Sequence, residues 1–250
     1  MIKSIAIHDI PLNHIAAVER WYYRHHGPEI ARRFGPWLTR LDSYLPVSPP
    51  LEAQAYGFHN WRVTEAWWRE LPEPGAQGNF SFTLPPMPAK GAACFVPVQP
   101  TEDFMGGQYQ PHEKNVLRWC VLFRYPAGVS AEEADRWFLD VHAKEVIQQP
   151  GLYRFFSYRV IQQLMPLPGT WPRAFEGKIV GSGWHRLCEL WYENFDDWRR
   201  SVIEAPPEYT RPSWAKYDKY PFFEPFVDFV SSFLLERPTD EFLRDARGYV

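Results

Sequence analysis

Residues 21–29 read Trp-Tyr-Tyr-Arg-His-His-Gly-Pro-Glu, and residues 137–145 read Trp-Phe-Leu-Asp-Val-His-Ala-Lys-Glu. Both stretches fit the pattern Trp-x4-His-x2-Glu, and both place an aromatic side chain one helical turn before the histidine. The sequence therefore encodes a helix with the same histidine at the same place twice. A repeat of this kind indicates that the chain contains two copies of one structural unit.

The repeat extends beyond these two helices. Segments rich in β-branched residues precede both motifs and end at Pro11 and Pro126, which predicts two strands. The pattern Arg-x-x-Ser-Tyr follows each motif, at residues 40–44 and 154–158. The pattern Pro-Thr-acid-acid-Phe then ends each half, at residues 100–104 and 238–242. Four anchors in the same order indicate two homologous units.

Each unit predicts the element order β-α-β-β-(α)-β, the ferredoxin-like arrangement with helices on one face of an antiparallel sheet. The other face of each sheet is apolar, so two units in one chain bury these faces against each other. The predicted fold class is α+β, with two tandem ferredoxin-like units forming an intrachain barrel of the dimeric α+β type. We expect a first unit over residues 1–108, a linker over 109–114 and a second unit over 115–250.

Composition limits the function classes. The chain of 250 residues is 45% hydrophobic and 17% aromatic with a net charge of −3, which disfavours a nucleic-acid or anionic-membrane partner. Its three cysteines are scattered and odd in number, as expected for reduced thiols in a cytoplasm. No stretch has metal-ligand spacing or the length of a membrane span, and no basic and apolar leader stands at the N-terminus. We expect a cytoplasmic protein without metal or cofactor. The sequence leaves open whether two copies of the fused barrel form a homodimer.

On these motifs the chain resembles the EthD-like branch of the dimeric α+β barrel superfamily. The matching residues are Trp21, His26, Glu29 and Tyr44 in one half and Trp137, His142, Glu145 and Tyr158 in the other. The resemblance implies a barrel that binds small hydrophobic molecules. Relatives of this kind include cofactor-free cyclases, decarboxylases, isomerases and small monooxygenases, and also haem-binding proteins.

The repeated histidines are the first candidates for chemistry. We expect Gly27-Pro28 to end the first motif helix, which places His26 at a helix C-terminus. There the helix dipole favours the imidazolium and burial favours the neutral ring, so small shifts cross physiological pH. Such a histidine transfers protons well. The alternative is that each histidine only fixes its helix end by bonding Glu29 or Glu145.

The two halves differ at positions that matter for a pocket. Aligned on Pro11 and Pro126, His8 corresponds to Phe123, and on the Arg-x-x-Ser-Tyr strand Asp42 corresponds to Phe156. Buried polar groups need partners, because each unpaired one costs about 1–3 kcal/mol. We therefore expect the first half to hold the working pocket and the second to be partly filled, unless His8 or Asp42 faces solvent.

The predicted function is a cofactor-independent enzyme that performs proton transfer on a hydrophobic aromatic or polycyclic molecule, by dehydration, decarboxylation, cyclisation or isomerisation. His26 or His8 acts as base or acid, Asp42 orients a histidine, and Tyr44 donates to a substrate oxygen. The predicted substrate-binding residues are Trp21, Tyr22, His59, Glu65, His142 and Tyr158. Two alternatives stay open: a non-catalytic small-molecule or haem carrier, and a cofactor-free monooxygenase.

Overall fold

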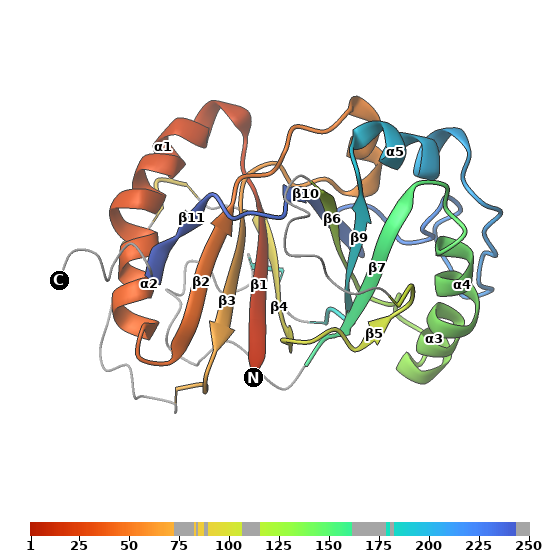
Figure 1. The fold of residues 1–250 in the computed structure, drawn as a ribbon, viewed down its shortest axis with the longest axis horizontal. Helices are drawn as coiled ribbons and strands as arrows, with labels where there is room; N and C mark the ends of the chain where they lie inside the picture. Colours follow the sequence, from red (N-terminus) through yellow and green to blue (C-terminus); the bar gives the residue numbers. More distant parts are fainter. Residues whose placement is uncertain are drawn as a thin grey trace.

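The computed structural model describes residues 1–72, 83, 85–87, 90–106, 116–161, 179–180 and 183–243. Two β-sheets lie face to face, and helices cover their outer sides (Figure 1). One sheet has the strand order β11-β2-β3-β1-β4-β8, and the other has the order β10-β6-β9-β7-β5. The predicted α+β class with two ferredoxin-like units is confirmed.

The first half contributes β1 (Ile2–Asp9), α1 (Ile15–Trp21), α2 (Gly27–Phe34), β2 (Leu38–Tyr44), β3 (Val63–Trp68), β4 (Lys90–Pro97) and β5 (Glu102–Asp103). The second half contributes β6 (Leu117–Phe123), α3 (Ala131–Trp137), α4 (Ala143–Val146), β7 (Leu152–Arg159), β8 (Ile179–Val180), β9 (Arg186–Tyr192), α5 (Phe195–Arg199), β10 (Phe229–Leu235) and β11 (Asp240–Glu241). Short 3₁₀ turns span Leu12–His14 and Leu51–Tyr56. Ser130 and Asn194 cap α3 and α5, each accepting a backbone N–H.

The motif helix of each unit continues beyond its histidine. A π-helical turn covers Tyr22–His26 between α1 and α2, and its counterpart covers Phe138–His142 between α3 and α4. The prediction that Gly27-Pro28 ends the first helix is therefore wrong. Pro28 lies in the first turn of α2, the part of a helix in which proline is tolerated. The same π turn occurs before Ala143, without a proline, so it belongs to the repeated motif.

The tails of the two units are exchanged. Strand β5, at the end of the first half, pairs antiparallel with β7 of the second half. Strand β11, at the end of the second half, pairs antiparallel with β2 of the first half. Each Pro-Thr-acid-acid-Phe segment thus adds an edge strand to the other unit's sheet, and the two units are joined at both tails.

A charged cluster lies in the layer between the sheets. The ammonium group of Lys3 lies 3.3 Å from Glu65 and 3.5 Å from Glu189, and Arg118 Nη1 lies 3.5 and 3.6 Å from the same two carboxylates. Lys3 and Arg118 occupy equivalent positions before Pro11 and Pro126, and the two glutamates are equivalent on β3 and β9. All four side chains are buried. Two cations and two anions offset each other there, within an otherwise apolar layer.

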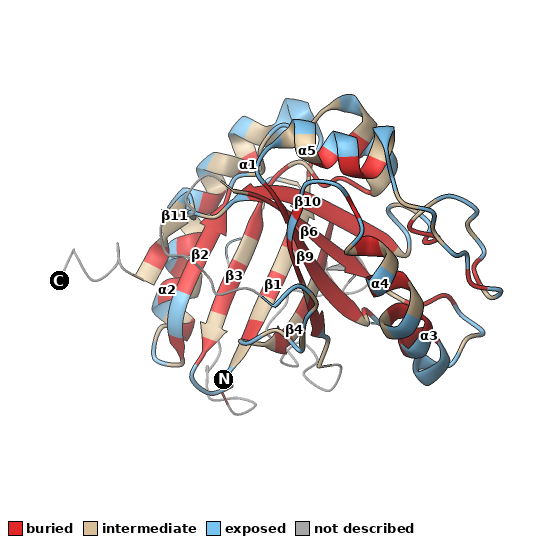
Figure 2. Cartoon of the chain, turned by 45° about the vertical axis from the view of Figure 1, so that its right-hand side comes forward, coloured by how far each residue is buried: buried red, intermediate tan, exposed pale blue. Residues whose placement is uncertain are grey.

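The two outer faces differ in how they are covered. Strand β1 alternates buried and half-buried residues, whereas β6 and β9 are buried at every position (Figure 2). The sheet of the second half is therefore packed on both faces, while the sheet of the first half is partly open on its helix side. Among the described residues, no helix has the length and apolar character needed to cross a bilayer.

Candidate functional site

In each unit the motif tryptophan and glutamate bind a threonine from later in the chain. Trp21 Nε1 donates to the carbonyl oxygen of Thr83 (2.9 Å), and Glu29 accepts from the backbone N–H (2.9 Å) and hydroxyl (2.5 Å) of the same threonine. In the second unit Trp137 Nε1 donates to the Thr210 carbonyl (3.2 Å), and Glu145 accepts the Thr210 N–H (3.1 Å).

This arrangement explains the spacing Trp-x4-His-x2-Glu. The tryptophan and the glutamate form a clamp for a threonine-bearing segment, and the histidine lies between them on the same helix. In the second unit Nδ1 of His142 has no hydrogen-bond partner among the described residues, and Glu145 binds the Thr210 N–H.

His8 and His26 approach the same space from the sheet and from the helix. The His26 ring lies 4.9 Å from the Trp21 ring and 5.3 Å from the Tyr22 ring. The Tyr22 ring is 5.5 Å from Trp61, whose ring is 5.7 Å from His8. We use the name first hollow for the group of side chains formed by His8, Tyr22, His26 and Trp61, of which Tyr22 and Trp61 are buried and the two histidines half-buried.

The two histidines of the first hollow are neutral at neutral pH. Burial lowers the pKa of His8 to about 3, with further lowering by the nearby His26, His59 and Arg62 charges. Burial also lowers the pKa of His26 to about 4, although the Glu29 carboxylate opposes this shift. The helix dipole expected to favour the imidazolium of His26 is absent because the helix continues through α2. Each ring therefore offers one N–H donor and one acceptor nitrogen at neutral pH.

Tyr22 supplies a hydroxyl at the same place. Its oxygen lies 3.1 Å from Thr64 Oγ1, and the guanidinium of Arg62 lies 4.3 Å from its ring centre. Burial raises the pKa of Tyr22, while Arg62 and the hydrogen bonds of Ser43 and Thr64 act in the opposite direction. The phenol therefore stays protonated and is a hydrogen-bond donor polarised by a buried cation.

Gly91 on β4 fixes the position of the His8 ring. The register of the sheet pairs His8 with Gly91, and a Cβ built on Gly91 falls 2.9 Å from His8 Nδ1. Any larger residue at position 91 would push the imidazole away, so the glycine makes room for the histidine.

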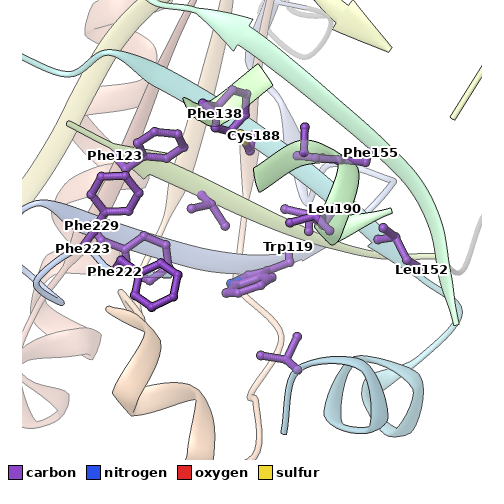
Figure 3. Packing of buried hydrophobic residues seen from close by; sticks show 14 of the residues in the cluster. Trp119, Phe123, Phe138, Leu152, Phe155, Cys188, Leu190, Phe222, Phe223 and Phe229 are labelled. Atoms are coloured by element: carbon purple, nitrogen blue, oxygen red, sulfur yellow. The ribbon is translucent and has the colours of Figure 1, made fainter. Parts of the chain in front are cut away.

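The equivalent space in the second unit is filled by aromatic rings. His142 is buried there, its ring 4.8 Å from Trp137 and 5.8 Å from Tyr220. Phe123, Phe138, Phe223 and Phe229 line the same space as His142, and Figure 3 shows these four rings within the core of the second unit. Burial lowers the pKa of His142 to about 3. The cavity that remains is about 20 Å³, the room of about one water molecule.

Sheet register shows which residues make this difference. His8 pairs with Gly91 in the first unit, and the equivalent pair in the second is Phe123 with Phe229. The next pair along is Ala6 with Ala93 in the first unit and Val121 with Ser231 in the second. The first pair alone replaces two phenyl rings by an imidazole and a hydrogen. His8, Ala6 and Ala93 are half-buried, whereas their three counterparts, Phe123, Val121 and Ser231, are buried.

Four of the predicted site residues lie on the other side of the sheet. Alternation along β2 and β3 points Asp42, Tyr44 and Glu65 into the layer between the sheets, and Tyr158 enters the same layer from β7. The predicted pairing of Asp42 with a histidine is wrong, because its partner is Arg40 at 2.5 Å. Burial raises the pKa of Asp42, while Arg40 opposes the shift.

The predicted roles of Tyr44 and Glu65 are also wrong. The Tyr44 hydroxyl donates to Glu65 Oε2 (3.3 Å), and Glu65 belongs to the charged cluster with Lys3 and Arg118. Burial raises the pKa of Glu65, but these two cations more than offset it, so the net shift is downward. These groups stabilise the contact between the units and do not face the first hollow.

The remaining predicted residues are divided between the two units. Trp21 and Tyr22 lie at the first hollow with His26, and His59 lies at its edge, buried and stacked on Phe226 at 6.0 Å. His142 lies in the filled space of the second unit. Sequence reasoning missed Trp61, Arg62, Thr64 and Gly91. An alignment of the two halves on β3 and β9 would have shown that Thr64 and Cys188 occupy equivalent positions.

Within the described part of the chain, no group of three or more histidine, cysteine, aspartate or glutamate side chains is placed to hold a metal ion.

A family model described as the chalcone isomerase N-terminal domain matches residues 1–83. No curated protein matches the chain. Among solved structures, the chain is similar to a candidate monooxygenase from Lactobacillus acidophilus NCFM, with 11% identity, coverage of 94% of this chain and 92% of that one, and a TM-score of 0.35. It is also similar to a major regulator of staphylococcal pathogenesis, with 6% identity, coverage of 94% and 99%, and a TM-score of 0.38.

Proposed function

We propose that this protein is a cofactor-independent enzyme of the isomerase type, acting by proton transfer on a hydroxylated aromatic ketone in the first hollow. The observation that carries the proposal is the difference between the two units. The first hollow groups two imidazoles, a phenol and an indole beside Gly91, while the equivalent place in the second unit is packed with phenyl rings. The matching chalcone isomerase segment, residues 1–83, contains His8, Tyr22, His26 and Thr64.

The proposed substrate class follows from the side chains in and beside the first hollow. Trp21, Tyr22 and Trp61 offer flat apolar surfaces, which suits an aromatic ring. The polar groups are neutral donors and acceptors on one side of these rings. A molecule with an aromatic ring, a phenolic hydroxyl and a conjugated carbonyl group meets both requirements, and a 2′-hydroxychalcone is the simplest example.

The proposed reaction is an intramolecular addition. Neutral His26 accepts the phenolic proton, and the phenolate oxygen bonds to the β-carbon of the enone. The resulting enolate oxygen accepts a hydrogen bond from the Tyr22 hydroxyl, which Arg62 polarises. The imidazolium of His26 then returns the proton to the α-carbon. Atoms and charge balance, and neutral His8 donates its ring N–H to a substrate oxygen.

We also propose that the chain is related to EthD-like proteins and is located in the cytoplasm. The three cysteines are free and buried, as suits a reducing compartment. No partner beyond the small molecule is invoked.

The test is an assay with 2′-hydroxychalcone and a panel of related phenolic enones. Cyclisation removes the conjugated absorption band, and chiral chromatography shows whether one enantiomer of the product is in excess. We expect turnover without added cofactor, equally fast under anaerobic conditions, with incorporation of one solvent deuterium at the α-carbon. A requirement for oxygen, or a Soret band in the purified protein without any turnover of the panel, would contradict the proposal.

A further inference from the structure

Residues 239–242, which we call the C-terminal tail, lie against the motif helix and strand β2 of the first half. Thr239 donates its backbone N–H to the Ser43 carbonyl (2.8 Å), and its hydroxyl oxygen accepts the N–H of Leu45 (2.9 Å). These bonds place Asp240 and Glu241 beside Ser43 and Asp42 as strand β11. The tail is therefore an edge strand of the sheet that carries the first hollow, as Figure 1 shows beside α2.

Asp240 completes the surroundings of a buried cation. Its Oδ2 accepts from Arg62 Nη1 (2.9 Å), and its carboxylate accepts from the Tyr23 hydroxyl (3.1 and 3.0 Å). Arg62 is fully buried and also bonds Glu19 of α1 and Ser43 of β2. The tail carboxylate thus links the helix to the sheet through the same guanidinium that lies over the Tyr22 ring.

Phe242 fills the space directly behind the catalytic helix turn. Its ring centre lies 5.6 Å from that of Tyr22. A Cβ built on Gly27 would fall 2.3 Å from the Phe242 ring, so a side chain at position 27 cannot coexist with it. Gly27 follows His26 immediately in the sequence. The ring of Phe242 therefore supports the backbone of the π turn at the residue next to the histidine.

We propose that Asp240 and Phe242 are positioning residues for the first hollow: the crossed C-terminal tail holds the π turn so that Tyr22 and His26 face the substrate. The inference rests on the proposed function, because it assigns a role toward the chemistry of that site. A site built from the first hundred residues then depends on residues 240–242.

The second unit provides matched controls. Glu102 occupies the place of Asp240 and accepts from Arg186 Nη1 (2.8 Å), and Arg186 bonds Ser157 as Arg62 bonds Ser43. Phe104 occupies the place of Phe242, with its ring 6.0 Å from Phe138 and 4.7 Å from Phe155. Loss of either tail contact removes similar packing and charge interactions, but only one tail adjoins the first hollow.

The experiment compares Asp240→Asn and Phe242→Ala with Glu102→Gln and Phe104→Ala, with Phe242→Leu as the milder variant should Phe242→Ala not fold. The readouts are kcat and KM with 2′-hydroxychalcone, thermal unfolding, and ¹⁵N chemical shifts of the His26 and His142 rings. We expect kcat to fall about tenfold or more in the first pair, with a smaller change in KM, and to stay within about twofold in the second pair.

The ring shifts decide the positioning role independently of any substrate. Phe242→Ala should move the His26 signals and leave those of His142 in place, and Phe104→Ala should do the reverse. If folded Asp240→Asn and Phe242→Ala keep both the wild-type kcat and the wild-type His26 signals while His26→Ala is inactive, the tail has no positioning role and the proposed function stands. If His26→Ala is as active as the wild type, the proposed function itself fails.

Discussion

The two units of this chain share a scaffold and differ in what they enclose. Each has a tryptophan and a glutamate that clamp a threonine, a buried arginine that binds a serine and two acids, and a histidine at the end of a π turn. In the second unit the enclosed space is filled by Phe123 and Phe229, and in the first by His8 and the hydrogen of Gly91. The repeated motif therefore builds the same helix, with the same supporting contacts, in both units. The sheet residues beneath that helix decide whether a site exists.

The largest effect on stability should come from emptying the filled unit. Phe229→Ala removes a buried ring from a cluster of phenyl groups, so we expect a loss of about 3–5 kcal/mol in the free energy of unfolding. Phe95→Ala, at a half-buried position of the partly open sheet, is the matched control and should cost less than half as much. Urea unfolding measures both, and equal losses would contradict the contrast between the two faces.

The charged cluster should matter equally to both units because it belongs to their shared layer. Glu65→Gln and Glu189→Gln each leave an uncompensated cation among buried groups, so we expect each to cost about 3 kcal/mol. The same unfolding experiment measures the two variants side by side. A neutral effect of one variant beside a large effect of the other would show that the cluster serves a single unit.

Acid should destabilise the protein through its buried histidines. The pKa of His142 is lowered to about 3 in the folded state, while an unfolded histidine titrates near 6.5. Between these values the unfolded state binds more protons, so stability falls as pH decreases, by about 1.4 kcal/mol per pH unit for each such group. His142→Phe should flatten this dependence between about pH 6 and pH 4, as measured by unfolding at a series of pH values. An unchanged slope would mean that His142 titrates normally.

The smallest expected difference lies in the clamps. The Thr83 hydroxyl donates to Glu29, whereas the contacts described for Thr210 use its backbone alone. Thr83→Val should therefore cost about 1 kcal/mol, and Thr210→Val close to nothing. Differential scanning calorimetry of the two variants tests whether the clamps differ in this way, and a larger loss for Thr210→Val would reverse the assignment.

Much of the fold was predictable because repeated anchors carry register. The strands ending at Pro11 and Pro126 and the two capped helices of the second unit follow from local signals. The exchange of the tails was not predictable, because Glu102 and Asp240 are equally able to pair with either unit's sheet. The continuation of the first helix through Pro28 was missed because Gly-Pro is a strong stop signal in sequence, and nothing in the sequence indicates the π turn that precedes it.

Part of the grouping of side chains in the first hollow was predictable for a related reason. His8, Tyr22 and His26 were found by comparing the halves, and their meeting depends only on helix periodicity and strand order. Asp42, Tyr44 and Glu65 were misplaced because strand parity was not fixed: a single step along β2 exchanges the face toward the helices for the face between the sheets. Ser43, one residue from Asp42, faces the helices and bonds Arg62.

We propose that the first unit carries out the chemistry and that the second unit supports it. The most direct measurement is the turnover of 2′-hydroxychalcone by His26→Ala and His142→Ala, with thermal unfolding as the folding control. We predict a loss of about a hundredfold or more for His26→Ala, the usual size of a proton-transfer contribution, and turnover within about threefold of wild type for folded His142→Ala. A greater loss in His142→Ala with the fold intact would contradict the claim and place the chemistry in the second unit.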